Sequence, residues 1–541
     1  MSADGDLEYR RWRAPREHAS ALIEPALSDV ENCWRQNQRR LAQPAMLRFS
    51  SLDDLRRQAR LELFDIARRH TLAYRDAPGP LSPDQPCLMA GHQPEMFHPG
   101  VWFKNYVLSA LGQRFAAAAI NLVIDNDTPH STAIRVPLDD AAATRVEPVP
   151  FDQATTDIAF EERTVIDAEL FASFGRRVRE AIAPLVANPL IERYWPLVLE
   201  TLPRMSNNIG LALAAARHRI EADHGLKTWE APLSHVCETT AFRRFLLELF
   251  GRAAELHAIH NAALDEYRRV NRVRSQTHPV PALAVEQDWL ELPLWMWTAD
   301  EPRRRRLFVR QTRGGIEFTD RQRQRLSIAM PESGCHGSDC IGLALEQLDE
   351  LSRAGLRLRP RALATTMFAR LVLSDLFLHG IGGGKYDQLT DVILRRFFAV
   401  EPPEFMVLTA TTHLPIAMPS VTADDLRATE LRLRRLEWNP EQCLPADAPE
   451  AARRLAADKR AWLERDLSGG QRRERHAAIQ QINADLRAFV ERQRSEAAAE
   501  RQRVAAELRR RTLLASREFS FCLFPEESLC KLLLELSMKG A

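Results

Sequence analysis

Two polar clusters, each directly after a short apolar run, constrain the fold of this chain more than any other feature. The first, Gly91-His92-Gln93-Pro94-Glu95 with His98-Pro99-Gly100, follows the apolar residues 87–90. The second, Asp125-Asn126-Asp127-Thr128-Pro129-His130, follows the apolar residues 120–124, and residues 101–115 between the clusters have a helical pattern. The order strand, polar loop, helix, strand, polar loop predicts a parallel α/β unit. In such folds both loops lie at the carboxyl edge of neighbouring strands, where ligands bind.

Length and composition place the chain among large globular proteins. With 541 residues it is too long for one core, and we expect two to four domains. A formal net charge of +1 gives no bulk electrostatic case for nucleic acid or an anionic membrane as a partner. No apolar run reaches the roughly 18 residues that span a bilayer, and the first 16 residues have no apolar core typical of a secretory signal. Eight irregularly spaced Cys residues fit reduced thiols, so we expect a cytoplasmic protein.

The pattern along the chain predicts four regions. Residues 1–80 read as a helical region, and residues 81–420 read as a Rossmann-like core with an inserted segment at about 137–350. Residues 421–515 are rich in Ala, Arg, Glu, Leu and Gln and carry an apolar heptad seam, which predicts an antiparallel coiled coil. Residues 516–541 are apolar enough to pack back on the core. The predicted fold class is α/β, with a Rossmann-like parallel-sheet core, helical insertions and a C-terminal antiparallel α-helical coiled coil.

Local patterns predict several elements within the core. Residues 292–297 and 306–310 read as two strands of a hairpin, and the basic run 303–306 reads as a solvated turn between them, with anion binding as the alternative. Residues 362–377 read as a helix, 379–385 as a Gly-rich loop and 386–398 as a second helix. Residues 405–409 are a strand candidate.

The first polar cluster has the chemistry of a binding site. A His at a strand end and at a helix N-terminus can donate to a phosphate or stabilise charge that develops there, which makes His92 and His98 candidates. Gly91 and Gly100 would let the backbone approach a ligand closely. The alternative is that His92 and Gln93 only cap backbone groups of a turn.

The second polar cluster offers carboxylates and an imidazole. Asp125, Asn126, Asp127 and His130 could bind Mg²⁺, a ribose or a substrate amine. They could also form an Asx turn that caps the next element. A zinc site is not indicated, because the ligand spacing is not that of known zinc motifs.

A third candidate is the Gly-rich segment that begins at His379. Its free backbone N–H groups and Lys385 would cradle a phosphate or a carboxylate. The spacing fits neither a P-loop nor a dinucleotide fingerprint, and the alternative is a flexible turn. The candidate binding residues here are Gly382, Gly383, Gly384, Lys385, Tyr386 and Asp387, with Asp391 one turn further on.

Two other features are assigned to structure. Cys335-His336 and Cys340 offer only three loosely spaced ligands, so a loop is favoured over a metal site, and we expect no bound metal there. Trp289, Trp295 and Trp297 are expected to anchor a core or an interface rather than to stack on a ligand.

Taken in order, these motifs resemble those of the bacillithiol-biosynthesis cysteine-adding enzyme family. Gly91-His92-Gln93 is similar to the family's Gly-Gln-Gln motif, and Asp125-Asn126-Asp127 with His130 is similar to its acidic cluster followed by His. Residues 380–386 stand where the family has Gly-Pro-Gly-Glu, and the resemblance covers about residues 85–540. It implies a Rossmann-type core, a C-terminal antiparallel coiled coil, and the joining of cysteine to the amine of a glucosaminyl-malate.

Departures from the family pattern concern the substrate more than the fold. His92 replaces the first Gln of the motif, Lys385-Tyr386 replaces its Glu-containing end, and the first 80 residues look different. We therefore expect a divergent branch with another amine or acyl acceptor. His98-Pro99-Gly100-Val101 is similar in part to the first signature of class I synthetase-like enzymes. Val in place of the final His, and the lack of a Lys-rich second signature, argue against a straightforward adenylating enzyme.

The leading hypothesis is a ligase-like enzyme that forms an amide or similar bond on a small polar substrate, with an amino acid such as cysteine as the acyl group. The strand-end residues His92, Gln93 and His98 would orient the substrate or stabilise a developing oxyanion or phosphate. The acidic cluster would hold the nucleophilic amine and remove its proton. The residues assigned to catalysis are His92, Gln93, His98, Asp125, Asp127 and His130, and those assigned to binding are Gly91, Asn126, Gly382, Gly383, Gly384, Lys385, Tyr386 and Asp387.

Cofactor and partners follow from the same hypothesis. ATP or ADP with Mg²⁺ is the cofactor that we would test, and a homodimer through the coiled coil is the expected assembly. The rival hypothesis is a non-catalytic scaffold with a degenerate Rossmann-like core that assembles through its coiled coil. Nucleic-acid binding by the Arg-rich residues 501–511 is disfavoured by the near-neutral charge and the interleaved Glu residues.

Overall fold

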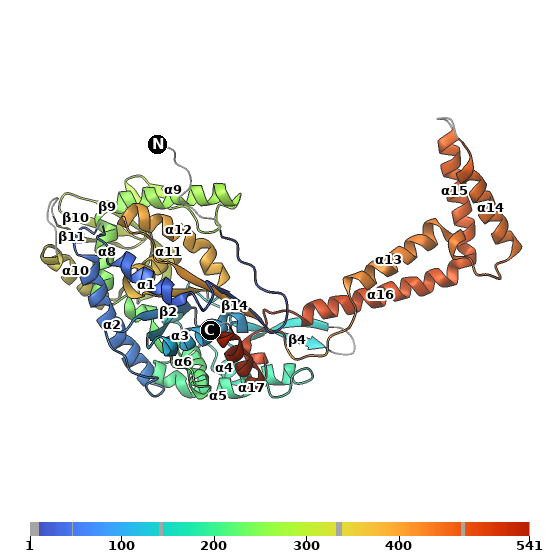
Figure 1. Cartoon of the computed structure of the whole chain (residues 1–541). Coiled ribbons are helices and arrows are strands. Elements are labelled where there is room, and N and C mark those ends of the chain that lie inside the picture. The colour runs from blue at the N-terminus through green and yellow to red at the C-terminus, as the bar shows by residue number, and fades with distance from the viewer. Residues whose placement is uncertain (1–9, 46, 140–143, 332–337, 467–470, 540–541) are drawn as a thin grey trace. The chain divides into compact units, whose positions relative to one another are not determined.

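The computed structural model describes residues 10–45, 47–139, 144–331, 338–466 and 471–539. The chain forms two compact units (Figure 1), which we call the core unit and the helical unit. The core unit comprises Met1–Val136, Glu147–Leu414 and Arg517–Ala541, and the helical unit comprises Pro137–Val146 and Pro415–Ser516. Among the helices within these described ranges, none combines the length and the apolar character that crossing a membrane requires.

A six-stranded, mostly parallel sheet forms the centre of the core unit. Its parallel strands lie in the order β14, β13, β2, β3, β6, and β1 pairs antiparallel with β14 at one edge. The first three parallel strands of the chain extend the sheet to one side and the last two extend it to the other, so the order reverses between β2 and β13. This Rossmann-like reversal opens a crevice beyond the carboxyl ends of those two strands. The strands are β1 (Ser20–Glu24), β2 (Cys87–His92), β3 (Ala118–Val123), β6 (Trp229–Pro232), β13 (Leu376–His379) and β14 (Phe405–Thr411).

The strand, helix, strand unit predicted from the polar clusters is confirmed. β2 and β3 are parallel neighbours, with Cys87 opposite Ala118 and His92 opposite Val123, and α3 (Pro99–Arg114) connects them. The apolar residues of β2 and all of β3 are buried, as expected for parallel strands covered on both faces.

Helices cover both faces of this sheet. Cys87 and Met89 belong to an apolar cluster with α2 (Leu52–Leu72), α8 (Thr240–Gly251) and α12 (Ile381–Phe398). Successive strand residues point to opposite faces, and α3 packs on the other face against β2, β3 and β14. Fully buried leucines of α2 such as Leu55 each contribute about 2 kcal/mol through the apolar area that they remove from water.

The segment predicted as one helix at 362–377 is divided, and this prediction is wrong at its end. α11 (Ala362–Phe368) continues into a π-helical turn, Ala369–Leu373, and the chain then forms β13. Asp375 explains the break, because its carboxylate accepts the backbone N–H of Cys87 and pairs with Arg56 and Arg60 of α2. The predicted loop at 379–385 is also wrong, since α12 begins at Ile381.

An antiparallel sheet lies beside the parallel one in the core unit. The predicted hairpin of residues 292–297 and 306–310 is confirmed as β8 and β9, but residues 303–306 belong to β9 and not to a turn. Acidic partners explain this correction, because Arg305 pairs with Glu301 and Arg306 pairs with Glu291. The strands of this sheet lie in the order β11, β10, β9, β8, β12, and β7 pairs with β8. Their bounds are β7 (Val285–Glu286), β8 (Trp289–Thr298), β9 (Glu301–Gln311), β10 (Gly315–Thr319), β11 (Arg325–Ala329) and β12 (Leu356–Pro360).

The remaining elements of the core unit are mainly helices. The pattern of residues 1–80 predicts helices only, whereas Ser20–Glu24 adds β1 to the main sheet. The C-terminal helix, α17, packs against α3. These helices are α1 (Val30–Leu41), α4 (Ala168–Ile182), α5 (Ile191–Thr201), α6 (Ile209–Asp223), α7 (Leu233–Val236), α9 (Ala253–Asn271), α10 (Gly342–Arg353) and α17 (Glu526–Met538). The residues of β4 (Ala133–Asp139) and β5 (Thr144–Pro150) are divided between the two units, and the two strands form a two-stranded sheet.

The helical unit contains two antiparallel helix pairs (Figure 1). Glu437 near the end of α13 pairs with Arg494 near the start of α16, and the backbone carbonyl of Val421 accepts from Arg511 near the end of α16. Buried Ala452 and Leu486 share the apolar cluster between α14 and α15. A short 3-10 turn separates α15 from α16. The helices are α13 (Ala423–Trp438), α14 (Glu450–Glu464), α15 (Gln471–Arg487) and α16 (Glu491–Leu514).

The cysteines depart in part from the expectation of reduced thiols. Cys340 is disulfide-bonded, so that expectation is wrong at this position. Six others are free thiols, and five of them are buried. Cys335 and His336 lie outside the described residues. The free cysteines are Cys33, Cys87, Cys237, Cys443, Cys522 and Cys530.

Candidate functional site

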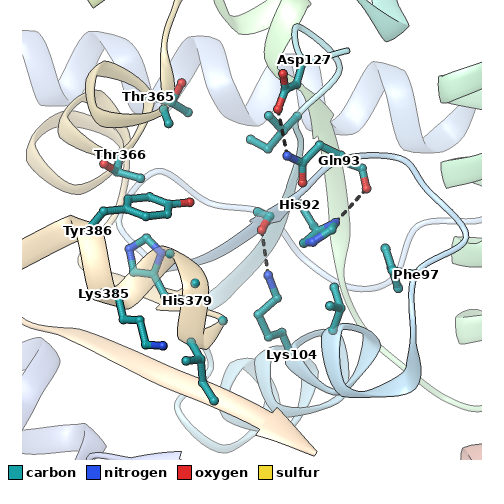
Figure 2. A pocket seen from close by; sticks show the side chains of 18 of the residues that line it. His92, Gln93, Phe97, Lys104, Asp127, Thr365, Thr366, His379, Lys385 and Tyr386 are labelled. Carbon is teal, nitrogen blue, oxygen red and sulfur yellow. Dashed lines mark hydrogen bonds between the residues drawn. The ribbon is translucent and has the colours of Figure 1, made fainter. Parts of the chain in front are cut away.

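A large cavity of about 1200 Å³ lies at the carboxyl edge of the parallel sheet, where the strand order reverses. Figure 2 shows side chains from β2, α3, β13 and α12 around it. Both polar clusters and the Gly-rich segment contribute to its wall, although they are far apart in the sequence. The predicted site residues that line it are Gly91, His92, Gln93, His98, Asn126, Asp127, His130, Gly382, Gly383, Lys385 and Tyr386. The predicted residues Asp125, Gly384 and Asp387 are not among the lining residues.

His92 stands at the end of β2 as a neutral imidazole. Its Nδ1 lies 3.1 Å from the backbone oxygen of Gln93, and only a protonated nitrogen can donate to that oxygen. Burial, followed by the nearby charge of Lys104, lowers the pKa of His92 well below its usual value. The Nε2 lone pair therefore remains free to accept a proton or a hydrogen bond.

Gln93 and Asp127 join the two polar clusters directly. The Gln93 side-chain amide donates to Asp127 Oδ2 at 2.9 Å, which Figure 2 shows. Asp127 Oδ1 accepts from Arg304 at 2.6 Å and from the backbone N–H of Thr128 at 2.9 Å. The carboxylate is thus held rigidly and its charge is balanced by Arg304 of β9, a residue that the sequence pattern placed in a solvated turn.

Glu95 and His130 form a second contact between the clusters. Glu95 Oε1 accepts from the backbone N–H and from Nδ1 of His130, both at 3.1 Å. The His130 side chain is 77% exposed, so it stands at the mouth of the cavity. Arg304 balances the charge of Asp127, whereas Glu95 has no Arg or Lys partner among the described residues, so Glu95 carries the less compensated acidic charge of the two.

His98 is the N-cap of α3. Its Nδ1 accepts the backbone N–H of Gly100 at 3.1 Å, which leaves the proton on Nε2, facing Glu518 at 3.5 Å. Burial, followed by the charge of Arg517, lowers the pKa of His98 to about 4. His98 therefore combines a capping role with a place in the cavity wall, and it is neutral near pH 7.

Asp125 does not serve the site as predicted. Its side chain is fully buried, and its two oxygens accept from the backbone N–H of Ser234 at 2.8 Å and from Ser234 Oγ at 2.5 Å. Burial raises the pKa of Asp125 to about 6 although these hydrogen bonds lower it. We correct its predicted catalytic role to that of a residue that anchors the start of α7.

The Gly-rich segment forms the first turn of α12 rather than a loop. Gly380 is the N-cap and offers no side chain to the first backbone N–H groups, and residues 380–383 line the cavity. A Cβ on Gly384 would lie 2.6 Å from Val407 Cγ2, whereas one on Gly382 would meet nothing within 4 Å. Gly384 is therefore required for packing against β14, and Gly382 is exposed in the wall.

Asp387 is a buried partner of His379 and not a ligand-facing group, which corrects its predicted role. Its Oδ2 lies 2.8 Å from His379 Nε2 and 2.7 Å from Arg370 Nη1. Burial alone would raise the pKa of Asp387, but Arg370 and His379 lower it below its usual value. His379 itself lines the cavity at the end of β13, so the Asp387 carboxylate orients a cavity residue.

Asn126 and Tyr386 occupy the wall in different ways. Asn126 is buried and donates to the backbone oxygen of Pro360 at 2.8 Å, which ties β12 to the acidic cluster. The Tyr386 hydroxyl points into the cavity (Figure 2). Burial, followed by the charges of Asp387 and Asp127, raises the pKa of Tyr386 to about 12, so the hydroxyl is a neutral donor.

Several cavity residues were missed by the sequence pattern. Lys104 had a signal, as a single Lys in the apolar helical stretch after the first cluster. Trp295 lines the cavity with Arg304 and Arg361 over its ring at 4.9 and 4.7 Å, whereas Trp289 and Trp297 are buried as expected. Glu95 and His379 also had a signal, since Glu95 ends the first polar cluster and His379 begins the Gly-rich segment. The residues contributed by β8, β9, α11 and the end of β12 had no local signal, because these elements reach the site only through the tertiary fold. The missed residues are Glu95, Lys104, Trp295, Arg304, Arg361, Thr365, Thr366 and His379.

Metal binding has no support from side-chain clusters. Within the described ranges, no group of three or more His, Cys, Asp or Glu side chains is placed to hold a metal ion. Cys335 and His336, two of the three loosely spaced ligands considered in the sequence, are not in those ranges.

The chain matches no protein-family model and no curated protein. What the cavity does is therefore inferred from its own side chains. They provide a neutral imidazole with a free lone pair, an acidic end at Glu95 and Asp127, and a basic side at Lys104 and Lys385.

Proposed function

We propose that the protein is an enzyme that forms C–N bonds, joining an amino acid or similar acyl group to the amine of a small polar substrate. Cysteine is the first candidate for the acyl group and an amino sugar for the amine. The resemblance to the bacillithiol-biosynthesis cysteine-adding enzyme family supports this choice of substrates. The departures at His92 and at Lys385-Tyr386 favour an acceptor that differs from the family's own.

One observation carries the proposal: a proton acceptor, an acidic end and a basic side share one cavity at the strand-order reversal. A condensing enzyme must remove a proton from an ammonium or amine, hold that amine near the acyl carbon and stabilise the negative charge that develops on the acyl oxygen. Open α/β sheets bind their ligands at this edge. A cavity of about 1200 Å³ has room for two small substrates.

Each role has a residue with suitable geometry. His92 accepts the amine proton at Nε2, because its Nδ1 is occupied by the Gln93 carbonyl. Glu95 attracts the amine. Gln93 and Arg304 hold the carboxylate of Asp127, and this carboxylate fixes the loop that positions the amine. The Tyr386 hydroxyl donates to the acyl oxygen from the opposite wall.

An activated acyl donor is part of the proposal. A free carboxylate does not condense with an amine spontaneously in water, so a phosphate or nucleotide ester of the acid is the reactive form, with ATP and Mg²⁺ as its first candidate source. As the C–N bond forms, the C–O bond to that leaving group breaks and the proton goes to His92. The first turn of α12 with Lys385 is placed to receive an anionic group.

We further propose that the helical unit is an antiparallel coiled coil through which two chains dimerise. Buried Leu436, Val490 and Ala497 lie along a seam between α13 and α16. Leu431 and Trp438 of α13 are 57% and 53% exposed, an apolar surface that a second copy would cover.

A condensation assay tests the enzymatic proposal. Purified protein is incubated with cysteine, glucosaminyl-malate, ATP and Mg²⁺, and products are read by mass spectrometry, with other amino acids and amino sugars in parallel. We expect a product whose mass is the sum of the substrates less one water. The change His92→Gln should slow its formation about 100-fold or more. His224→Gln, which changes a histidine outside the cavity bonded to Glu526, should not slow it. A folded protein that forms no condensed product with any pair contradicts the proposal and favours a scaffold.

A further inference from the structure

Lys104 is a buried cation without a counter-charge. Its side chain lies on α3 and lines the cavity, and the residue is 3% exposed. Its Nζ donates to the backbone oxygen of Gly91 at 2.8 Å (Figure 2). In the described part of the chain, its other two N–H groups have no acceptor and it pairs with no carboxylate. A buried ammonium in this situation is costly unless an anion arrives from outside.

The surroundings of Lys104 make an ammonium still less favourable. The groups that face it directly are His92 on β2, His98 at the start of α3, His379 on β13 and Arg217 on α6, and none of these four is acidic. The nearest carboxylates have other partners, because Glu518 faces His98 at 3.5 Å and Glu221 and Glu230 pair with Arg217. Burial, followed by the charge of Arg217, lowers the pKa of Lys104 to about 7, so the amine is only partly protonated near neutral pH.

The first turn of α12 faces the same region of the cavity. Gly383 lies against the ring of His379, which in turn is close enough to Lys104 to be affected by its charge. The backbone N–H groups of this turn have no side-chain cap, and in the described ranges the exposed Lys385 ammonium has no partner. Figure 2 shows Lys104 and Lys385 entering the cavity from two different helices. Uncapped N–H groups and two ammonium groups are the donors that phosphate and carboxylate oxygens prefer.

The choice of lysine is itself informative. Only six of the 74 basic residues of this chain are Lys, and two of those six line the cavity. Arginine stays charged in almost any surroundings, whereas a buried lysine can lose and regain its proton. Position 104 therefore holds the less frequent basic residue at a place where that difference matters.

We propose that Lys104 and the first turn of α12 form a subsite for a phosphate or carboxylate group of the ligand, and that Lys104 takes up a proton when this anion binds. The inference rests on the proposed function, and it adds that one substrate is anionic. The anion supplies the missing counter-charge, so the protonated amine becomes favourable in the complex. Binding is then coupled to proton uptake above neutral pH and uncoupled from it below.

Titration calorimetry of the full chain with sulfate and with malate tests this inference. Sulfate stands for a phosphate group and does not titrate between pH 6 and 8, and malate stands for a carboxylate ligand. Each titration is run at pH 6 and pH 8 in two buffers with different heats of ionisation, which gives the number of protons taken up. We expect uptake that approaches one proton per anion at pH 8 and falls towards zero at pH 6. Comparison of the two anions separates phosphate from carboxylate recognition.

Three variants sharpen the test. Lys104→Met should bind the anion about tenfold more weakly or worse, and without proton uptake. Lys104→Arg should bind it without uptake, because arginine is already charged. The exposed Lys227 lies outside the cavity, so Lys227→Met should behave as the wild type.

Two results would overturn the inference. One is anion binding by the wild type without proton uptake at pH 8, a result that needs no variant to fold. The other is a failure of both anions to bind, or equal binding by Lys104→Met. The condensation assay is independent of these outcomes. Condensed product without proton-coupled anion binding would support the proposed enzyme and contradict the subsite, and proton-coupled anion binding without condensed product would do the opposite.

Discussion

Two carboxylates only two residues apart have different tasks in this molecule. Asp125 turns inward to anchor α7 through Ser234, and Asp127 turns to the cavity, where Gln93 and Arg304 hold it. Both follow the same strand, so the sequence places both at the correct sheet edge. Which one points inward depends on Ser234 and Arg304, which lie more than a hundred residues further along the chain.

Alanine substitutions should separate these two roles. Asp125→Ala leaves the buried N–H and O–H of Ser234 without an acceptor, so it should lower the free energy of unfolding by about 1–3 kcal/mol. It should leave ligand-induced stabilisation unchanged. Asp127→Ala should abolish that stabilisation with a smaller effect on folding, because the Asp127 side chain is 34% exposed. Urea unfolding and thermal shift measure the two effects, and the reverse result would show that the roles are exchanged.

Lys104 should make the stability of the protein depend on pH in a specific window. The folded protein lowers the pKa of this group from 10.5 to about 7, so between these values the unfolded chain binds more protons than the folded one. Stability contributed by this group is therefore lowest below pH 7 and rises with pH up to about 10.5, by at most about 1.4 kcal/mol per pH unit. Urea unfolding at pH 7, 8 and 9 should show a steeper rise for the wild type than for Lys104→Met. Parallel pH profiles would contradict this.

At the scale of the element, the Gly-rich segment shows why local patterns can mislead. Residues such as Gly382, Gly383 and Gly384 have low helix propensity, so a loop is the expected result. The helix forms because its later turns are buried against the sheet and Gly384 allows close contact with Val407. The apolar run before it could equally be helix or strand. The contacts of Asp375 with Cys87 and with α2, which are distant in the sequence, favour the start of β13 there.

Matched glycine substitutions test this account of α12. Gly384→Ala would place a Cβ 2.6 Å from Val407 Cγ2 beside Phe405, so it should destabilise the protein by about 1–3 kcal/mol through overpacking. Gly382→Ala meets nothing within 4 Å and should be neutral or stabilising by up to about 1 kcal/mol, because alanine favours the helix. Chemical denaturation of both variants gives the comparison. Equal effects would mean that the close packing of α12 on β14 is wrong.

At the scale of the whole molecule, strong periodic patterns in the sequence predict the central parallel strands of the main sheet but not its shorter strands or the strands of the second sheet that reach the cavity. The parallel pair of β2 and β3 follows from buried apolar runs, and β14 follows from residues 405–409. β1, β12 and β13 could not be predicted, because each is short and depends on neighbours distant in the sequence. For the same reason the sequence indicates the strand-end half of the cavity wall but not the half from Trp295, Arg304 and Arg361.

Dimerisation through the helical unit is a prediction at this scale. Leu431→Glu puts a charge on an apolar side chain of α13 that is 57% exposed, so it should convert a dimer to a monomer without unfolding the chain. Leu61→Glu, at a leucine of α2 that is 50% exposed, is the matched control and should leave the dimer intact. Sedimentation equilibrium measures both. A monomeric wild type, or equal behaviour of the two variants, would refute the dimer.

The central claim is that the cavity at the strand-order reversal binds the substrates of a condensing enzyme. Thermal shift against cysteine, amino-sugar conjugates and nucleotides, with and without Mg²⁺, tests it most directly, because a bound ligand stabilises the folded protein by mass action. The account predicts a concentration-dependent rise in Tm for the wild type and for Asp125→Ala, and its loss in His92→Ala and Asp127→Ala. A flat response of the wild type to the whole panel, or a rise that survives in His92→Ala and Asp127→Ala, would contradict it.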